Sequence, residues 1–138
     1  FENSWKSCCF GGFLFGREAI RHMVPSGEGT LLFTGASASL RGRPNFGAFN
    51  SAKAGLRTLA QAMAKEYGPQ GIHVGHVVID GTIAGEKIMN RIPNFVEKLD
   101  RGQLINLEGI VDSYVFLHKQ SRQAWTFELD LRTSMEQW

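Results

Sequence analysis

Hydrophobic positions near the start of the chain recur at helical spacing and then give way to a short apolar run. The helical spacing predicts an amphipathic helix over about residues 4–24. The positions that carry it are Phe10, Phe13, Leu14, Ile20, Met23 and Val24. Pro25-Ser26-Gly27 should end this helix, because proline cannot continue a helix and glycine readily adopts the left-handed conformation of a helix end. The apolar run over residues 30–34 predicts a short buried strand.

A longer helix and a second strand follow. Residues 46–67 carry the most regular helical pattern, through Phe49, Ala52, Leu56, Leu59, Ala60, Met63 and Tyr67. Residues 68–71 include two glycines and a proline and should end the helix. Residues 72–79 are rich in β-branched side chains, which predicts a strand. A strand, a helix and a strand in this order form a right-handed crossover, so the two strands should be parallel.

The last third of the chain predicts shorter elements. Residues 81–102 indicate loop and short helix, and residues 107–119 indicate a further helix. Over residues 125–131, apolar side chains alternate with polar ones, which is typical of a strand with one apolar and one polar face. Such one-sided patterning predicts a strand at a sheet edge. Together these elements predict an α/β fold with a parallel sheet.

Composition and charge narrow the possible partners. The chain has 138 residues, 43% of them hydrophobic, and a net charge of +2, which is typical of one globular domain. Because Lys and Arg are scattered along a nearly neutral chain, we expect neither nucleic acid nor a membrane as a partner. The longest apolar stretch is too short to cross a bilayer and no signal peptide opens the chain, so we expect a cytoplasmic protein. The adjacent Cys8 and Cys9 predict neither a disulfide framework nor a metal site.

The turn after the first predicted strand does not have the composition of a phosphate-binding loop. Residues 34–39 follow a strand, but the further glycines that would let a backbone approach a pyrophosphate are replaced by Ser39 and Arg41. We therefore interpret this segment as an ordinary turn. His73 and His76 are three residues apart on a strand and should point to opposite faces, so they do not form a metal-binding pair.

The segment Phe49-Asn-Ser-Ala-Lys53-Ala-Gly-Leu, continuing through Gly71-Ile-His-Val74, resembles the short-chain dehydrogenase/reductase family. Four other segments match that family in order: Gly11-Gly-Phe13-Leu, Gly29-Thr-Leu-Leu-Phe, Ile72-His-Val-Gly-His-Val-Val-Ile-Asp-Gly81 and Trp-Thr-Phe-Glu-Leu-Asp-Leu131. The resemblance implies a Rossmann-like, doubly wound parallel sheet. It also implies that residues 1–138 form a single domain that is only the C-terminal portion of the fold, with the first βαβ unit and the glycine-rich cofactor loop lying before Phe1.

The family uses four catalytic side chains. By the resemblance, three of the four positions carry other residues in this sequence. A tyrosine moves the substrate's proton, a lysine lowers its pKa and holds the nicotinamide ribose, a serine binds the substrate carbonyl and an asparagine supports the lysine. The tyrosine position is Phe49, the serine position is Ala36 and the asparagine position is Cys8, so only Lys53 remains. Phe49 cannot exchange a proton, and loss of a general acid or base costs roughly 10²–10⁴-fold in rate.

By the same resemblance, four residues would bind the cofactor, NAD or NADP: Lys53, Asp80, Gly81 and Ile83. In the loop after the second strand, the family's usual proline is Asp80 and its glycine is retained as Gly81. The threonine that would contact the nicotinamide amide is Gly85.

Each substituted position also has a structural interpretation. Phe49 lies on the predicted apolar stripe of its helix, so packing alone would explain it. Lys53 lies on the same face and would either keep the ribose contact or extend its stem to solvent. Cys8 is either a thiol nucleophile or a small core residue. Asp80 is either a surrogate acid or a loop residue that satisfies local backbone donors.

Displaced groups could replace the lost ones. Ser37 and Ser39 flank Ala36 and could supply a hydroxyl shifted by one residue. Tyr67 and Tyr114 are not followed by a lysine at the right spacing, so neither rebuilds the motif.

Two functions remain open. The first is an NAD(P)-dependent oxidoreductase that acts on an unknown alcohol or carbonyl substrate and transfers the proton through water or a displaced group. The second is a non-catalytic relative, a pseudoenzyme that serves binding or structure. The resemblance also implies a homodimer or homotetramer through helices at about residues 4–24 and 46–67, with the edge strand over residues 125–131 available for the tetramer.

Overall fold

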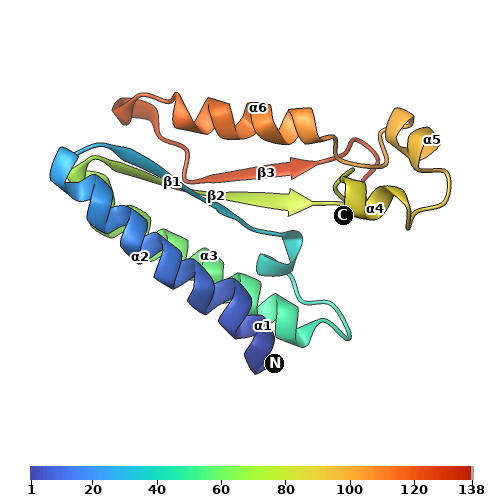
Figure 1. Ribbon diagram of the computed structural model, residues 1–138, viewed down its shortest axis with the longest axis horizontal. Helices are drawn as coiled ribbons and strands as arrows, with labels where there is room; N and C mark the ends of the chain where they lie inside the picture. Colours follow the sequence, from blue (N-terminus) through green and yellow to red (C-terminus); the bar gives the residue numbers. More distant parts are fainter. Residues whose placement is uncertain (138) are drawn as a thin grey trace.

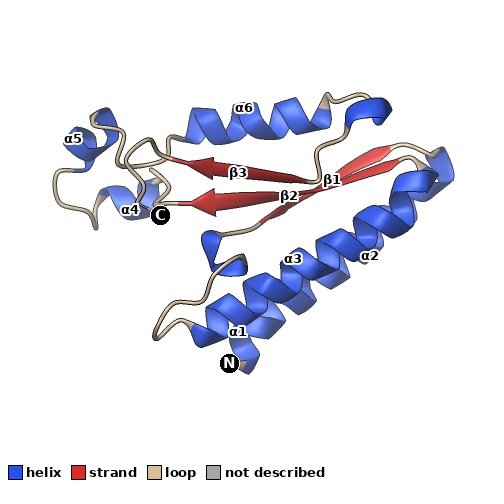
Figure 2. Cartoon of the chain, turned by 180° about the vertical axis from the view of Figure 1, so that it is seen from behind, coloured by secondary structure: helices blue, strands red, loops and turns tan. Residues whose placement is uncertain are grey.

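Three parallel strands form the centre of the fold, in a computed structural model that describes residues 1–137 (Figures 1 and 2). The strands are β1 (Gly29–Thr34), β2 (Ile72–Asp80) and β3 (Glu128–Arg132), in the order β1-β2-β3. Gly29 lies opposite Ile72 at the start of the first pair, and His76 lies opposite Glu128 at the start of the second. The predicted parallel pairing is confirmed.

Helices cover both faces of the sheet, as a doubly wound fold requires (Figure 1). α2 (Gly11–Met23) and α3 (Gly47–Tyr67) lie on one face, and α6 (Leu107–His118) lies on the other. α1 (Glu2–Trp5) runs into α2 through a π-helical turn, Lys6–Phe10, which the periodicity did not predict. The Rossmann-like α/β architecture is therefore confirmed.

Short elements fill the connections. They are α4 (Glu86–Met89), α5 (Phe95–Asp100) and the 3₁₀ segments Val24–Ser26, Ser37–Ser39, Gly68–Gln70 and Arg122–Ala124. α4 and α5 lie beyond the carboxyl end of β2, next to the end of β3 (Figure 2). This is the end of the sheet at which the candidate site lies.

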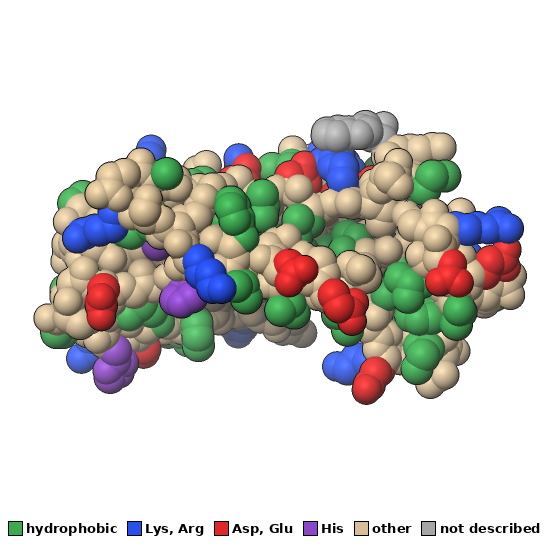
Figure 3. Space-filling model, turned by 90° about the horizontal axis from the view of Figure 1, so that it is seen from above, with side chains coloured by type: hydrophobic (Ala, Val, Ile, Leu, Met, Phe, Trp, Pro, Cys, Tyr) green, Lys and Arg blue, Asp and Glu red, His purple; other side chains and the backbone are tan. Residues whose placement is uncertain are grey.

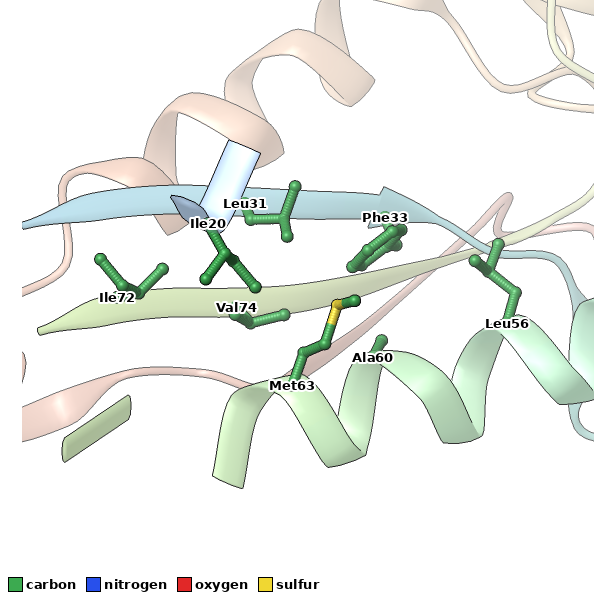
Figure 4. Close-up of a cluster of buried hydrophobic side chains, with 8 residues drawn as sticks. All are labelled: Ile20, Leu31, Phe33, Leu56, Ala60, Met63, Ile72 and Val74. Atoms are coloured by element: carbon green, nitrogen blue, oxygen red, sulfur yellow. The ribbon is translucent and has the colours of Figure 1, made fainter. Parts of the chain in front are cut away.

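The larger core cluster lies between the sheet and the pair α2–α3 (Figure 4). Its eight buried members are Ile20, Leu31, Phe33, Leu56, Ala60, Met63, Ile72 and Val74. The helices approach the strands closely because small residues face them: a Cβ at Gly16 would lie 2.9 Å from the Phe33 ring and 3.1 Å from the Met63 sulfur. On the α6 face, a second cluster of four buried residues contains Val77, Ile79, Ile105 and Leu117.

β3 has the predicted one-sided character but begins later than predicted. Leu129 and Leu131 pack against the α6-side cluster, and β3 lies at one end of the strand order in the described part of the chain. The strand starts at Glu128, not at Trp125. Trp125 instead stacks on the His73 ring, at 4.9 Å between centroids, so its ring is used for packing before the chain enters the sheet.

The surface carries charges of both signs. In the view from the α6 side, Lys and Arg side chains are interspersed with Asp and Glu side chains and with hydrophobic ones (Figure 3). Within residues 1–137, no helix combines the length and the hydrophobicity that a membrane crossing would need.

Candidate functional site

A cavity of about 710 Å³ lies at the carboxyl ends of β1 and β2, and its volume is within the roughly 300–1,000 Å³ of small-molecule sites. In open parallel sheets, ligands bind outside this end of the strands. The cavity brings together all seven residues that the resemblance singled out for catalysis or cofactor binding: Cys8, Ala36, Phe49, Lys53, Asp80, Gly81 and Ile83. Gly85, the position of the family's threonine, precedes the first turn of α4 instead.

Lys53 reaches the cavity from the second turn of α3. Its Nζ donates a hydrogen bond to the backbone oxygen of Thr34, the last residue of β1, at 3.0 Å. The same nitrogen lies 5.8 Å from the centre of the Phe49 ring, a distance at which a cation and a ring attract each other. Lys53 is therefore held at the cavity by two contacts, and its side chain is not a free solvated stem.

Phe49 lines the cavity and is not a core residue. Its exposed fraction is 38%, whereas the buried stripe of α3 consists of Asn50, Ala52, Leu56, Ala60 and Met63. The prediction that Phe49 packs within the apolar stripe is thus wrong, because this first turn of α3 borders the cavity where the strands have ended. The ring presents hydrocarbon to whatever occupies the cavity.

The two cysteines of the π-helical turn face different surroundings. Cys8 lines the cavity, and Cys9 packs against α3, where its Sγ would lie 3.0 Å from a Cβ at Gly55. Burial, together with the neighbouring Cys8, raises the pKa of the Cys9 thiol. Cys9 is therefore a packing residue, whereas Cys8, for which the sequence left a thiol nucleophile and a small core residue open, is half-buried at the cavity.

Asp80 ends β2 with a side chain that is only 4% exposed. Its two carboxylate oxygens accept hydrogen bonds from one Arg41 nitrogen at 3.1 and 3.0 Å, and Arg132 lies 3.5 Å away. Burial alone would raise the pKa of Asp80, but hydrogen bonds from Ser37 and Arg41 and the two arginine charges outweigh it and lower the pKa. Asp80 is thus a carboxylate paired with arginines. The prediction that Asp80 satisfies local backbone donors is wrong. Because Asp80 is ionised at neutral pH, it has no proton to donate as a surrogate acid.

Asn50 ties the loop after β1 to α3. Its Nδ2 donates to the backbone oxygens of Ala38 at 3.0 Å and of Arg41 at 2.8 Å. Its Oδ1 accepts from the backbone nitrogen of Arg43 at 3.2 Å. Because Asn50 is itself nearly buried, these three hydrogen bonds hold one wall of the cavity in place.

The two serines beside Ala36 differ in orientation. Ser39 is buried and donates its hydroxyl to the backbone oxygen of Ala36 at 2.7 Å, so it is not available to a ligand. Ser37 lines the cavity. Its single hydroxyl hydrogen is donated to Asp80, so neither serine offers a free donor to a substrate carbonyl.

A charged network that includes one buried histidine lies next to the cavity. His76 is fully buried, and its Nδ1 lies 2.9 Å from Glu128, which also accepts two hydrogen bonds from Arg57 at 2.6 and 2.9 Å. The hydrogen bond from Arg57, opposed by partial burial, lowers the pKa of Glu128, so the carboxylate accepts and His76 Nδ1 donates. Burial lowers the pKa of His76 despite this partner, which keeps the ring neutral. A Cβ at Gly35 would collide with His76 Nε2. Packing alone therefore explains why position 35 is a glycine, and a bound phosphate is not needed to explain it.

Comparison with known proteins identifies the family. Residues 1–91 match the family described as short chain dehydrogenase. The chain therefore belongs to the short-chain dehydrogenase/reductase family of oxidoreductases, whose members bind nicotinamide cofactors.

Three relatives illustrate the range of the likeness. A solved short-chain dehydrogenase from Rhodopseudomonas palustris is 38% identical, with a TM-score of 0.73 over 95% of this chain and 50% of its own. The NADPH-dependent aldehyde reductase-like protein of Arabidopsis thaliana is 30% identical over 100 residues, 72% of this chain and 37% of that protein. The inactive 2-(S)-hydroxypropyl-CoM dehydrogenase 2 of Xanthobacter autotrophicus is 38% identical over 74 residues, 54% of this chain and 32% of that protein. The chain spans less than half the length of these two curated relatives.

Proposed function

We propose that the protein is an NAD(P)-dependent oxidoreductase that converts an alcohol and a carbonyl compound into each other without the family's tyrosine. The observation that carries this proposal is the placement of Lys53 at the cavity, with Nζ 3.0 Å from the Thr34 carbonyl. An ammonium group has three N–H donors. One is used by Thr34, so two are left for the hydroxyls of a ribose and a substrate.

The residues around Lys53 fit the nicotinamide half of such a cofactor. The loop that contains Gly81 and Ile83 is held in place, because Ala84 donates to the Ile105 carbonyl at 2.8 Å and Ile105 donates to the Thr82 carbonyl at 2.9 Å. In our proposal this loop borders the nicotinamide ring. Asp80, through its pair with Arg41, holds the loop after β1 that forms one wall of the cavity. When bound, the cofactor supplies or accepts a hydride. Phe49 and Ala36 would form an apolar wall beside the substrate's carbonyl group.

A non-catalytic role is the second candidate. The three substituted positions, Phe49, Ala36 and Cys8, support it, and one relative carries the word inactive in its name. Cofactor titration separates the two functions. Our proposal expects NADPH or NADH to gain fluorescence with the protein, to raise its melting temperature and to be consumed with an aldehyde. A protein that binds neither cofactor would contradict it, and binding without turnover of any carbonyl compound would favour the pseudoenzyme.

We also propose a homodimer through the helices at about residues 4–24 and 46–67, with β3 available for a tetramer. It is supported by aromatic side chains exposed along α1, the π-helical turn and α2: Trp5, Phe10, Phe13 and Phe15. Trp5 and Phe10 stack at 5.8 Å, and exposed apolar clusters of this kind mark interfaces. Light scattering should give a dimer or larger for the protein and a smaller species for Phe15→Glu. A monomeric parent at micromolar concentration would contradict the proposal.

A further inference from the structure

We infer that Lys53 itself donates the proton to the substrate's carbonyl oxygen, directly from Nζ, which makes it the general acid of the reaction. This inference rests on the proposed oxidoreductase function. It assigns to Lys53 the proton transfer that the family's tyrosine performs. Phe49, which occupies that position here, has no exchangeable proton.

The geometry around Nζ leaves one donor free for a substrate. Thr34 accepts the first N–H at 3.0 Å, and a bound ribose would accept the second. The third N–H would meet a tyrosine oxygen if position 49 carried one, but here the neighbour is the Phe49 ring, 5.8 Å from Nζ to the ring centre. A ring attracts the cation without accepting its proton in an ordinary hydrogen bond. The donor therefore remains available to an oxygen that enters the cavity.

Other groups near the cavity fit this role less well. Asp80 is held as a carboxylate by Arg41 and Arg132, so it has no proton to give. Tyr114 hydrogen bonds the Thr34 hydroxyl at 2.6 Å from the α6 side of β1, and burial raises its pKa. Cys8 and Glu136 also line the cavity. The variants Cys8→Ala and Glu136→Gln test whether either residue donates the proton.

The proposed reduction transfers one hydride and one proton to the substrate. The substrate's carbonyl carbon takes the hydride that a reduced nicotinamide cofactor supplies, and the carbonyl π pair moves to the oxygen. That oxygen takes a proton from Nζ and becomes a hydroxyl. Lys53 is left as a neutral amine and regains a proton from solvent, because its side chain is only partly buried.

The test compares Lys53→Arg with the parent protein, using NADPH and a panel of benzaldehyde, hexanal and cyclohexanone. Arginine keeps the charge and the hydrogen bonds but does not release a proton. We expect the NADPH dissociation constant, from nicotinamide fluorescence, to change by less than about threefold and kcat to fall about 100-fold or more. Adding Phe49→Tyr to Lys53→Arg should recover at least about tenfold of the lost kcat, because the phenol supplies a proton.

Two results would overturn the inference. The first is Lys53→Arg with kcat within about threefold of the parent, since an arginine does not act as a general acid. The second is an equal loss of kcat in Cys8→Ala or Glu136→Gln. A parent protein that binds neither NADPH nor NADH, or that binds a cofactor but reduces no carbonyl compound, would instead overturn the proposed function, so the two failures are distinguishable.

Discussion

The surface of the cavity and the layer directly behind it differ in chemistry. At the surface, the three positions that the resemblance assigns to the family's serine, tyrosine and asparagine carry a methyl group, a phenyl ring and a thiol, at Ala36, Phe49 and Cys8. Behind it, Asn50 makes three hydrogen bonds, and Asp80 is paired with two arginines. The comparison teaches that the residues behind the cavity are held by hydrogen bonds and ion pairs, whereas the candidate reactive surface carries side chains that differ from the family's. Lys53 belongs to both regions, because it is anchored to β1 and faces the cavity.

The largest effect on the frame is expected from Asp80→Asn. The substitution leaves Arg41 and Arg132 without their shared carboxylate, and loss of the buried member of an ion pair is strongly destabilising. We expect the free energy of unfolding to fall by about 3 kcal/mol, measured by urea denaturation. The exposed Asp112→Asn on α6 is the matched control and should stay within about 0.5 kcal/mol. Equal stability of the two variants would show that the pair does not support the frame.

A smaller loss is expected from Asn50→Ala. It removes three hydrogen bonds and leaves the backbone groups of Ala38, Arg41 and Arg43 to find other partners. Unfolding should become easier by about 2 kcal/mol, and hydrogen exchange should increase in the loop after β1. The exposed Asn90→Ala should change neither quantity. Unchanged exchange in the loop of the Asn50 variant would mean that this side chain does not hold the wall.

The smallest effect is a pH dependence that comes from His76. Its pKa in the folded protein is lowered by burial, whereas in the unfolded chain it returns to about 6.5. Between these values the unfolded chain binds the extra proton, so stability is complete above about pH 6.5 and falls as the pH decreases toward the folded pKa. Glu128 and Asp80, whose pKa values are also lowered, act in the same direction at lower pH.

Urea denaturation at about pH 7 and about pH 5.5 measures this dependence. His76→Gln should flatten it, and His22→Gln, at an exposed position on α2, should leave it unchanged. The same slope in the parent and in His76→Gln would assign the acid sensitivity to other groups.

The helices and strands were predictable where one face of an element packs on the sheet. The helix predicted over residues 46–67 is found as α3, Gly47–Tyr67, because its apolar positions meet β1 and β2. The π-helical turn Lys6–Phe10 left no trace in the spacing, since a single wider turn barely shifts the helical pattern. Residues 125–131 alternate as a strand does, but stacking of Trp125 on His73 delays the strand to Glu128.

The position of the candidate site was predictable, and its frame was not. The order of motifs placed Phe49 and Lys53 one helical turn apart, and both line the cavity. The ion pair between Arg57 and Glu128 joins residues 71 positions apart, and that between Arg41 and Asp80 joins residues 39 apart. Such partners are chosen by the packing of long side chains in three dimensions, for which a single sequence carries no local signal.

The most direct test of the account is the affinity for NADPH of Lys53→Met compared with Lys65→Met, measured by titrating nicotinamide fluorescence. Lys65 lies on the same helix at an exposed position away from the cavity. Loss of a charge-assisted hydrogen bond costs about 1.5–3 kcal/mol, so Lys53→Met should weaken binding about tenfold or more. Lys65→Met should stay within about twofold of the parent protein. Equal affinities for the two variants would contradict the assignment of the cavity as the nicotinamide site.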